Sequence, residues 1–363
     1  MKFINAREEE YVPEKYLSFD DILLVPQHSF LASRRHPWTE TIIGKNSILS
    51  IPIIASPMDT ICGSEMAIEL YKLGGLGILH RYHSSLEIYK QLCKTVFDNT
   101  EGNFGISIGL NDRWFSFLEE IEKMSVMPKL VCLDVAHGFM EKALEFIAKI
   151  RKRFPTIDIM SGSISTTGAA EANINAGTNI LRVGIGGGSL CTTRIVTGHG
   201  MPTFSSVYMI AKYLKKSGYK ATIIADGGIR NSGDCVKALA AGADAVMLGK
   251  LLAGSNEAPG EVIERENCFT YGGYKVFYKK YRGQSSKAFQ EVNGLLRDGV
   301  TAEGEDTYVN CIGPVADRIK ELMGGIRSGM SYSGAGSLKK LRDDSLAIEV
   351  GHNVLVESQP HGK

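Results

Sequence analysis

A cysteine follows a run of glycines near the middle of the chain, in a pattern suited to covalent catalysis. Residues 183–194 read V-G-I-G-G-G-S-L-C-T-T-R, and Cys191 stands just after the glycines. Glycine adopts positive φ at little cost and lets the backbone approach a ligand, so a small reacting atom could reach the thiol. The two threonines supply hydroxyl donors, and Arg194 supplies a positive charge that favours the thiolate. The same pattern also fits a glycine-rich turn with an incidental buried cysteine.

Two further glycine turns could hold an anionic group. Asp226-Gly227-Gly228-Ile229-Arg230 follows one apolar run, and Gly249-Lys250 follows the next. Backbone N–H groups in such turns can point at a phosphate, and Asp226 can accept hydrogen bonds from sugar hydroxyls. Lys250 can add a charge to phosphate or extend into solvent. One glycine cluster alone is more often an ordinary turn. Two of them beside a cysteine turn favour a phosphorylated substrate, either a sugar phosphate or a nucleotide.

Eight short runs rich in β-branched residues alternate with segments of helical periodicity, such as 140–153 and 207–217. This alternation favours the α/β class and a closed (β/α)8 TIM barrel over an open doubly wound sheet. Active sites of such barrels lie at the carboxyl ends of the strands, and phosphate is commonly held after strands seven and eight, where the last two glycine turns fall. The expected strands are 51–55, 76–79, 104–108, 130–133, 157–160, 179–183, 222–225 and 243–248.

Composition limits the classes of protein to consider. The 363 residues suffice for one large barrel, and we expect a single domain over 1–363. A net charge of +1 without a basic block argues against a nucleic-acid partner. Seven cysteines without metal-ligand spacing indicate free thiols in a reducing compartment. Because no signal peptide or long apolar run is present, we expect a cytoplasmic protein without a membrane segment.

Five separate motifs resemble those of the IMP dehydrogenase and GMP reductase family, in the family's order from about residue 17 onward. They are LSFDDILLVP at 17–26, ASPMDT at 55–60, GGGSLCTTR at 186–194, ADGGIR at 225–230 and YRG at 281–283. The resemblance implies a (β/α)8 barrel that binds a purine 5′-monophosphate and forms a covalent bond between Cys191 and purine C2. It also implies hydride exchange with NAD or NADP, and a homotetramer.

The resemblance assigns roles to individual residues. Cys191 would be the nucleophile, and Thr193 and Glu303 would complete the catalytic set. The residues implied to hold the monophosphate are Ser56, Met58, Ser189, Asp226, Gly228, Gly249, Lys250, Tyr281, Gly283, Gln284 and Ser285. The residues implied to lie at the nicotinamide cofactor are Asp134, Ala136 and His137, although a lone histidine at a strand end is more often structural. The carbonyls of Gly186, Gly188 and Cys191 match those that bind a monovalent cation, such as potassium, in many relatives.

Several positions depart from the family pattern. Gly187 stands where the cysteine loop usually has proline, so the loop is less pre-organised in the unfolded chain. Lys250 replaces a serine or glycine after the eighth strand. Gln284 stands where a methionine often packs by the base, and its amide could read a purine edge by hydrogen bonding. Ser163 replaces a common asparagine near the nucleotide.

A flap after the eighth strand, expected over 265–312, bears on which reaction of the family applies. The resemblance implies that a dehydrogenase hydrolyses its purine intermediate with an Arg-Tyr pair on this flap. Residues 282–302 contain no such pair and are several residues fewer than in typical dehydrogenases. In a reductase, residues at the positions of Thr193 and Glu303 protonate the departing amine, and general acid catalysis is worth about 10²–10⁴-fold. The flap therefore favours GMP reductase.

Other segments favour the alternative, IMP dehydrogenase. Residues 17–26, 258–261, 281–283 and 357–361 look more like dehydrogenase sequences than like the reductases of animals. The span 84–104 leaves no room for the tandem nucleotide-sensing domain that many dehydrogenases carry. A third hypothesis is a nucleotide-binding protein without turnover. The intact catalytic set argues against that hypothesis.

Overall fold

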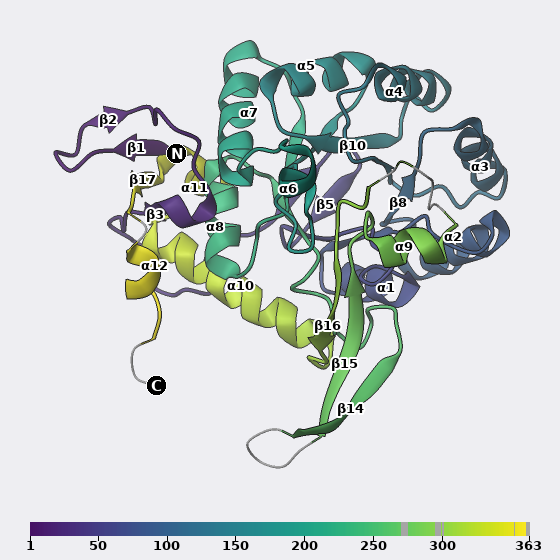
Figure 1. Ribbon diagram of the computed structural model, residues 1–363. Coiled ribbons are helices and arrows are strands. Elements are labelled where there is room, and N and C mark those ends of the chain that lie inside the picture. Colours follow the sequence, from purple (N-terminus) through teal and green to yellow (C-terminus); the bar gives the residue numbers. More distant parts are fainter. Residues whose placement is uncertain (270–274, 295–298, 300, 352, 361–363) are drawn as a thin grey trace.

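Eight parallel strands close into a barrel in the computed structural model, which describes residues 1–269, 275–294, 299, 301–351 and 353–360 (Figure 1). Each expected strand is present, and the prediction of a (β/α)8 barrel is confirmed. The strands are buried because helices cover the outside of a parallel barrel. They are β6 (Ile53–Ala55), β7 (Leu76–Leu79), β8 (Gly105–Ile108), β9 (Leu130–Asp134), β10 (Asp158–Ile164), β11 (Ile180–Val183), β12 (Thr222–Asp226) and β13 (Ala245–Leu248), and β13 pairs with β6.

Amphipathic helices form the outer layer (Figure 1). The predicted helix 140–153 is α4 (Glu141–Arg153), which buries Ala143, Phe146, Ile147 and Ile150 as its periodicity predicts. The predicted helix 207–217 lies within the longer α7 (Thr203–Ser217). The other helices of this layer are α1 (Ser64–Lys72), α2 (Leu86–Thr100), α3 (Asp112–Lys123), α5 (Thr167–Ala176), α8 (Ser232–Ala241) and α10 (Val315–Tyr332).

A short hairpin closes the amino-terminal mouth of the barrel. It consists of β4 (Thr41–Ile43) and β5 (Ser47–Leu49), and its Ile43 and Leu49 pack into the apolar barrel interior. The buried carboxylate of Asp158, at the start of β10, accepts hydrogen bonds from the backbone N–H groups of Lys45 and Asn46, each at 2.9 Å. The carboxyl ends of the strands are therefore left as the open end of the barrel.

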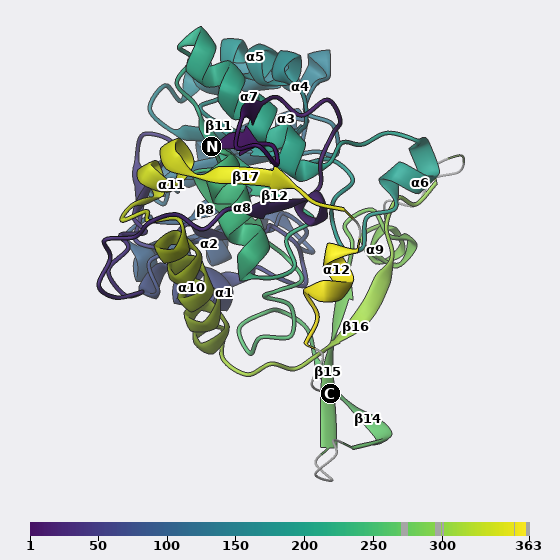
Figure 2. The same cartoon turned by 90° about the vertical axis from the view of Figure 1, so that its left-hand side faces the viewer.

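Segments after β13 form a flap that projects away from the barrel in both overall views (Figures 1 and 2). Its antiparallel sheet contains β14 (Val262–Phe269), β15 (Lys275–Arg282) and β16 (Asp306–Asn310). Lys279 on β15 is buried and donates to the carbonyls of Ser255, Asn256 and Ala258 at 2.7–3.0 Å, which anchors the flap to the loop after β13. Residues 270–274, 295–298 and 300 of the expected flap, and the side chain of Cys268, lie outside the described residues.

Two distant parts of the chain meet in a separate four-stranded sheet. Its strands are β2 (Glu10–Tyr11), β1 (Lys2–Ile4), β17 (Leu346–Glu349) and β3 (Ile22–Leu24), in that order. The shorter helices are η1 (Phe19–Asp21), α6 (Thr193–Thr197), α9 (Lys287–Val292), α11 (Leu338–Asp344) and α12 (Val354–Glu357). Across the described ranges, none of the helices combines the length and apolar character needed to cross a membrane.

Candidate active site

A cavity of about 450 Å³ opens where the carboxyl ends of the strands meet the flap. Pockets of this size commonly hold small-molecule ligands. Most of the residues that the sequence predicts for the site line it. They are Ser56, Met58, Asp134, Ala136, Gly186, Gly188, Ser189, Cys191, Thr193, Asp226, Tyr281, Gly283, Gln284, Ser285 and Glu303.

The cysteine turn leaves β11, the sixth barrel strand, at Val183. Gly184 has φ 146°, and a Cβ atom there would lie 1.8 Å from the backbone oxygen of Asp226, so the two strand ends touch only because this residue is glycine. The turn closes with a hydrogen bond of 3.0 Å from the N–H of Cys191 to the carbonyl of Gly188. Cys191 is partly exposed at the cavity. By contrast, burial raises the pKa of the Cys132 and Cys235 thiols to about 12.

Three side chains form a continuous hydrogen-bonded chain at the cavity. The Cys191 thiol donates to the Thr193 hydroxyl with an Sγ–Oγ1 distance of 3.1 Å, and that hydroxyl donates to Glu303 Oε2 at 2.8 Å. Backbone hydrogen bonds to the cysteine turn and to the flap hold Glu303 in place. The N–H of Thr192 donates to the Glu303 carbonyl and the N–H of Glu303 donates to the Ser285 carbonyl, each at 3.0 Å. A proton can therefore move between sulfur and carboxylate through one hydroxyl.

One wall of the cavity joins β15 of the flap to the loops after β6, β11 and β13. Tyr281 is buried beside Ser189, with 3.1 Å between their hydroxyl oxygens, and burial raises the pKa of the Tyr281 phenol. A Cβ atom on Gly249 would lie 3.3 Å from Tyr281 Oη and 3.5 Å from Met58 Sδ. A Cβ atom there would be in tight contact with the Tyr281 hydroxyl and in ordinary contact with the Met58 sulfur. These loops therefore form one compact wall of small and hydroxyl-bearing groups.

Arg182 was not predicted as a site residue, yet its side chain joins two residues that were, Asp134 and Asp226. Its Nη1 donates to Asp134 Oδ1 at 2.8 Å and its Nε donates to Asp226 Oδ2 at 2.7 Å. Burial lowers the pKa of Arg182, but the charges of Asp226 and Asp134 outweigh burial and raise it above its ordinary value. The arginine is therefore a permanent cation between the two carboxylates.

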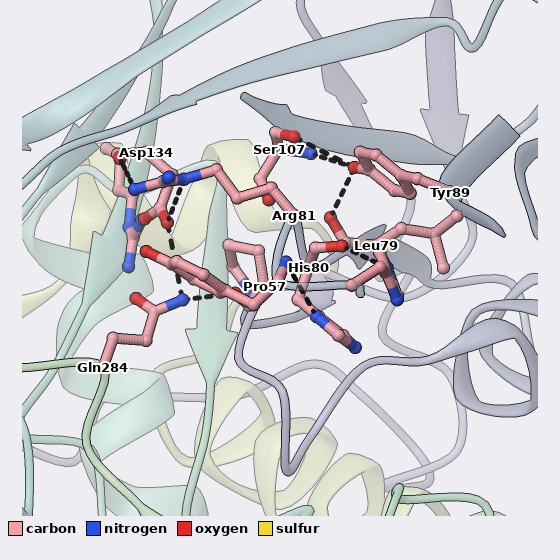
Figure 3. Close-up of polar contacts among 11 residues, drawn as sticks. Pro57, Leu79, His80, Arg81, Tyr89, Ser107, Asp134 and Gln284 are labelled. Carbon is pink, nitrogen blue, oxygen red and sulfur yellow. Dashed lines mark hydrogen bonds and ion pairs between the residues drawn. The ribbon is translucent and has the colours of Figure 1, made fainter. Parts of the chain in front are cut away.

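Arg81 and Tyr82, after β7, complete this side of the cavity. Figure 3 shows Arg81 reaching toward Asp134. Arg81 Nε lies 3.5 Å from Asp134 Oδ2, and its guanidinium stacks 4.4 Å from the centre of the Tyr82 ring. Burial raises the pKa of the Tyr82 phenol, so it stays protonated at neutral pH. Gln284 approaches the same carboxylate from the flap, with Nε2 3.4 Å from Asp134 Oδ2. Asp134 therefore contacts three side chains at once.

Comparison with known proteins places this site in a family. A model of the IMP dehydrogenase / GMP reductase domain matches residues 16–361. The chain belongs to the IMP dehydrogenase and GMP reductase family. It is 40% identical to GMP reductase 2 of Bos taurus over 93% of this chain and 95% of that protein. It is 35% identical to the GMP reductase of Ascaris suum over 93% and 94%. It is 33% identical to the inosine-5′-monophosphate dehydrogenase of Borreliella burgdorferi over 96% and 98%.

Membership in the IMP dehydrogenase and GMP reductase family makes the chain an NAD(P)-dependent oxidoreductase. Purine monophosphates and nicotinamide dinucleotides are the family's substrates. Some residues predicted from the family pattern lie outside the cavity lining. Lys250 and His137 are exposed, and the half-buried Gly228 and Gly249 are not among the residues that line the cavity. Their roles at the ligands stay predictions, as does a potassium ion at the carbonyls of the cysteine turn.

Arg194, expected to bring charge to the thiol, lies between Gly186 and Gly200 and donates to the carbonyl of Met201 at 2.8 Å. The hydroxyl of Thr193 contacts the thiol instead. The sequence did contain a signal for Arg182, because it is a charged residue inside an apolar strand. A buried charge is almost always paired, so a carboxylate partner could have been expected. Arg81 and Tyr82 follow the strand 76–79, and no recognised motif includes them. The sequence therefore offered no comparable signal for these two residues.

Proposed function

We propose that this protein is a GMP reductase, which converts GMP, NADPH and a proton to IMP, ammonia and NADP. The observation that carries the proposal is the chain from Cys191 through Thr193 to Glu303, with distances of 3.1 and 2.8 Å. Loss of an amine from a purine needs both a nucleophile at C2 and an acid for the leaving nitrogen. These three side chains supply the two functions within one hydrogen-bonded unit.

The residues account for each proton and bond of this reaction. The thiol proton moves through Thr193 to the Glu303 carboxylate as sulfur adds to C2. Glu303 then returns the proton through Thr193 to the 2-amino group, which leaves as ammonia and leaves a C2–S thioimidate. Hydride adds to C2, and the C–S bond breaks to give IMP and the free thiolate. Covalent catalysis thus divides one difficult displacement into two easier steps.

We assign one part of the lining to the nicotinamide riboside, namely Asp134, Val135, Ala136 and Ser163. The carboxylate of Asp134 can accept hydrogen bonds from ribose hydroxyls, and the small side chain of Ala136 leaves room for the ring. When bound, the reduced nicotinamide supplies the hydride. On the nucleotide, Asp226 would accept from the ribose hydroxyls, and the wall of Ser56, Met58 and Tyr281 would face the base and phosphate.

Two further observations support reductase over dehydrogenase. The identity to GMP reductase 2 of Bos taurus is 40%, against 33% to the dehydrogenase of Borreliella burgdorferi. The flap sequence from 282 to 302 has no Arg-Tyr pair that would activate water. An IMP dehydrogenase remains the second candidate, because that dehydrogenase aligns over 96% of this chain.

One assay tests the proposal. The protein is incubated with GMP plus NADPH or NADH, and separately with IMP plus NAD or NADP, while the absorbance of the reduced cofactor is followed. We expect oxidation of the reduced cofactor with GMP and release of ammonia. Cys191→Ala should bind GMP and lose turnover by several orders of magnitude, whereas Cys311→Ala should retain activity. Formation of reduced cofactor from IMP, with release of XMP, would instead identify a dehydrogenase.

A further inference from the structure

The side chain of Arg182 leaves β11 and reaches two other strands of the barrel. Its partners, Asp134 and Asp226, are the last residues of β9 and β12. β12 is a direct neighbour of β11, but β10 lies between β11 and β9. A Cβ atom on Gly162 of β10 would lie 2.7 Å from Arg182 Cβ and 2.4 Å from the Arg182 carbonyl oxygen. Glycine at position 162 therefore leaves room for the arginine beside β10.

One guanidinium holds both carboxylates. Arg182 Nη1 donates to Asp134 Oδ1 at 2.8 Å, and Nε donates to Asp226 Oδ2 at 2.7 Å. The side chains of Arg182, Asp134 and Asp226 are 9%, 6% and 17% exposed, so water competes little for these bonds. Because a guanidinium is planar and rigid, a shift of one carboxylate together with its hydrogen bond turns the group that holds the other. Arg182 is therefore a stiff link between two strand ends.

The two carboxylates that Arg182 links line the cavity and serve different ligands in the proposed function. We propose that Arg182 is a positioning residue that couples binding of the nucleotide to binding of the cofactor, an inference that rests on the proposed function for the identity of the ligands. The ribose of the nucleotide donates to Asp226, which holds the guanidinium and, through it, Asp134. The cofactor ribose then meets an acceptor that is already ordered, so the cofactor binds more tightly.

Arg81 provides a comparison, because it contacts only one of the two carboxylates. Its Nε lies 3.5 Å from Asp134 Oδ2, and its Nη2 donates to the Asp134 carbonyl at 3.3 Å (Figure 3). Across the described ranges, Arg81 makes no hydrogen bond or ion pair with Asp226. Arg81 should therefore support cofactor binding without linking it to the nucleotide.

The test measures the coupling with two ligands that cannot react with each other. IMP and NADPH both already carry the hydride, so they bind together without turnover. The dissociation constant of NADPH is measured by its fluorescence, without IMP and with saturating IMP. In the wild type IMP should tighten NADPH binding by about 5-fold or more, the lower end of typical couplings between sites. In Arg182→Gln this factor should fall to about 1–2, and an unchanged factor would overturn the proposal.

Arg81→Gln is the matched control. It should weaken NADPH binding and leave the factor by which IMP tightens that binding as it is in the wild type. A merely structural role of Arg182 would likewise lower affinities without changing the factor. If Arg182→Gln does not fold, Arg182→Lys keeps the buried charge without the planar fork, and the factor should again fall. A wild type in which IMP does not tighten NADPH binding would also overturn the proposal.

The result for Arg182 is separable from the result for the proposed function. If the protein is a dehydrogenase, IMP and NADH form the corresponding unreactive pair, and the same loss of coupling is expected in Arg182→Gln. Turnover with GMP therefore decides the reaction, whereas the coupling factor decides the role of Arg182.

Discussion

The guanidinium of Arg282 binds the carboxylate of Asp59 behind the cavity, with Nε 2.7 Å from Oδ2. The Asp59 side chain is 6% exposed, and its Oδ1 has no hydrogen-bond partner among the described residues. Burial raises the pKa of Asp59, and Arg282 opposes that rise. Asp59 belongs to the loop after β6, and Arg282 ends β15. The ion pair therefore fixes the flap residues that line the cavity relative to the barrel.

Loss of this ion pair should destabilise the protein and loosen the site. Arg282→Ala leaves a buried carboxylate unpaired, so we expect it to lower the free energy of unfolding by about 3 kcal/mol. The KM for the nucleotide should rise. Urea unfolding and steady-state kinetics measure both effects. Arg318→Ala removes a more exposed pair with Glu321 and should change stability by less than about 1 kcal/mol. Equal losses in the two variants would show that the Arg282 pair has no special role.

Substitution of Glu303 tests the direction of the chemistry. Glu303→Gln removes the acid that protonates the departing amine, so ammonia release from GMP should slow by about 10²-fold or more. Hydride exchange between IMP and the cofactor involves no amine departure and should change less. Rapid-mixing absorbance and intact-protein mass spectrometry distinguish the steps. A burst of reduced cofactor from IMP, followed by accumulation of a purine adduct on Cys191, would instead assign the residue to hydrolysis in a dehydrogenase.

His80 should make stability depend on pH in the mildly acidic range. Burial, aided by His83 and Arg282, lowers the pKa of His80 to about 3, and its Nδ1 accepts the N–H of Tyr82 at 3.2 Å. Below the ordinary histidine value of about 6.5 the unfolded chain binds a proton that the folded protein does not. Stability is therefore lost as pH falls from 6.5 toward 3, by about 2 kcal/mol at pH 5.

The measurement compares urea unfolding at pH 7 and pH 5. His80→Gln should reduce the difference between the two pH values by about 2 kcal/mol, even if its stability at pH 7 is lower. His199→Gln alters an exposed histidine and serves as the control. An unchanged pH dependence in His80→Gln would mean that His80 does not stay neutral in the folded protein.

The barrel was predictable because its signals are local. Each strand is a short apolar run, and the amphipathic face of α4 repeats with helical periodicity. The sheet that joins β1 to β17 was not predicted, because residues 2–3 pair with 346–347 and nothing local marks such a distant partner. The closing hairpin at 41–49 was missed for a similar reason, since its burial depends on fitting into the barrel mouth.

The residues of the candidate site also fall into those that local motifs predict and those that only the fold brings together. The cysteine turn and the two later glycine turns were visible as motifs, and family resemblance supplied Glu303 and the flap residues. The contacts of Arg182 with Asp134 and Asp226 could not be read from spacing, because the three residues lie on different strands. The fixed amide of Gln284 likewise depends on Pro57 and Asp134, which only the fold brings near it.

The final prediction concerns the glycine that replaces proline in the cysteine turn. A Cβ atom on Gly187 would lie 2.7 Å from Thr203 Oγ1, and that buried hydroxyl has no hydrogen-bond partner among the described residues. Gly187→Pro alone should therefore overpack the turn and cost about 1–3 kcal/mol of stability. Thr203→Ala alone should be nearly neutral, because it removes an unsatisfied hydroxyl.

The two changes should compensate when they are combined. With the hydroxyl gone, the next atoms that a Cβ on residue 187 would meet are the backbone carbon of Gly227 at 3.3 Å and the backbone nitrogen of Gly228 at 3.4 Å. The main clash is then removed, and the restriction of the unfolded chain by proline should add about 0.4–1 kcal/mol of stability. Urea unfolding of the wild type, both single variants and the double variant gives the coupling free energy between the two positions. We expect the double variant to be more stable, by more than about 1 kcal/mol, than the sum of the two single effects predicts. Turnover should rank the four proteins in the same order as their stability, because Gly187 lies in the turn that positions Cys191. Additive effects within about 0.5 kcal/mol would show that Thr203 is not what excludes proline from this loop.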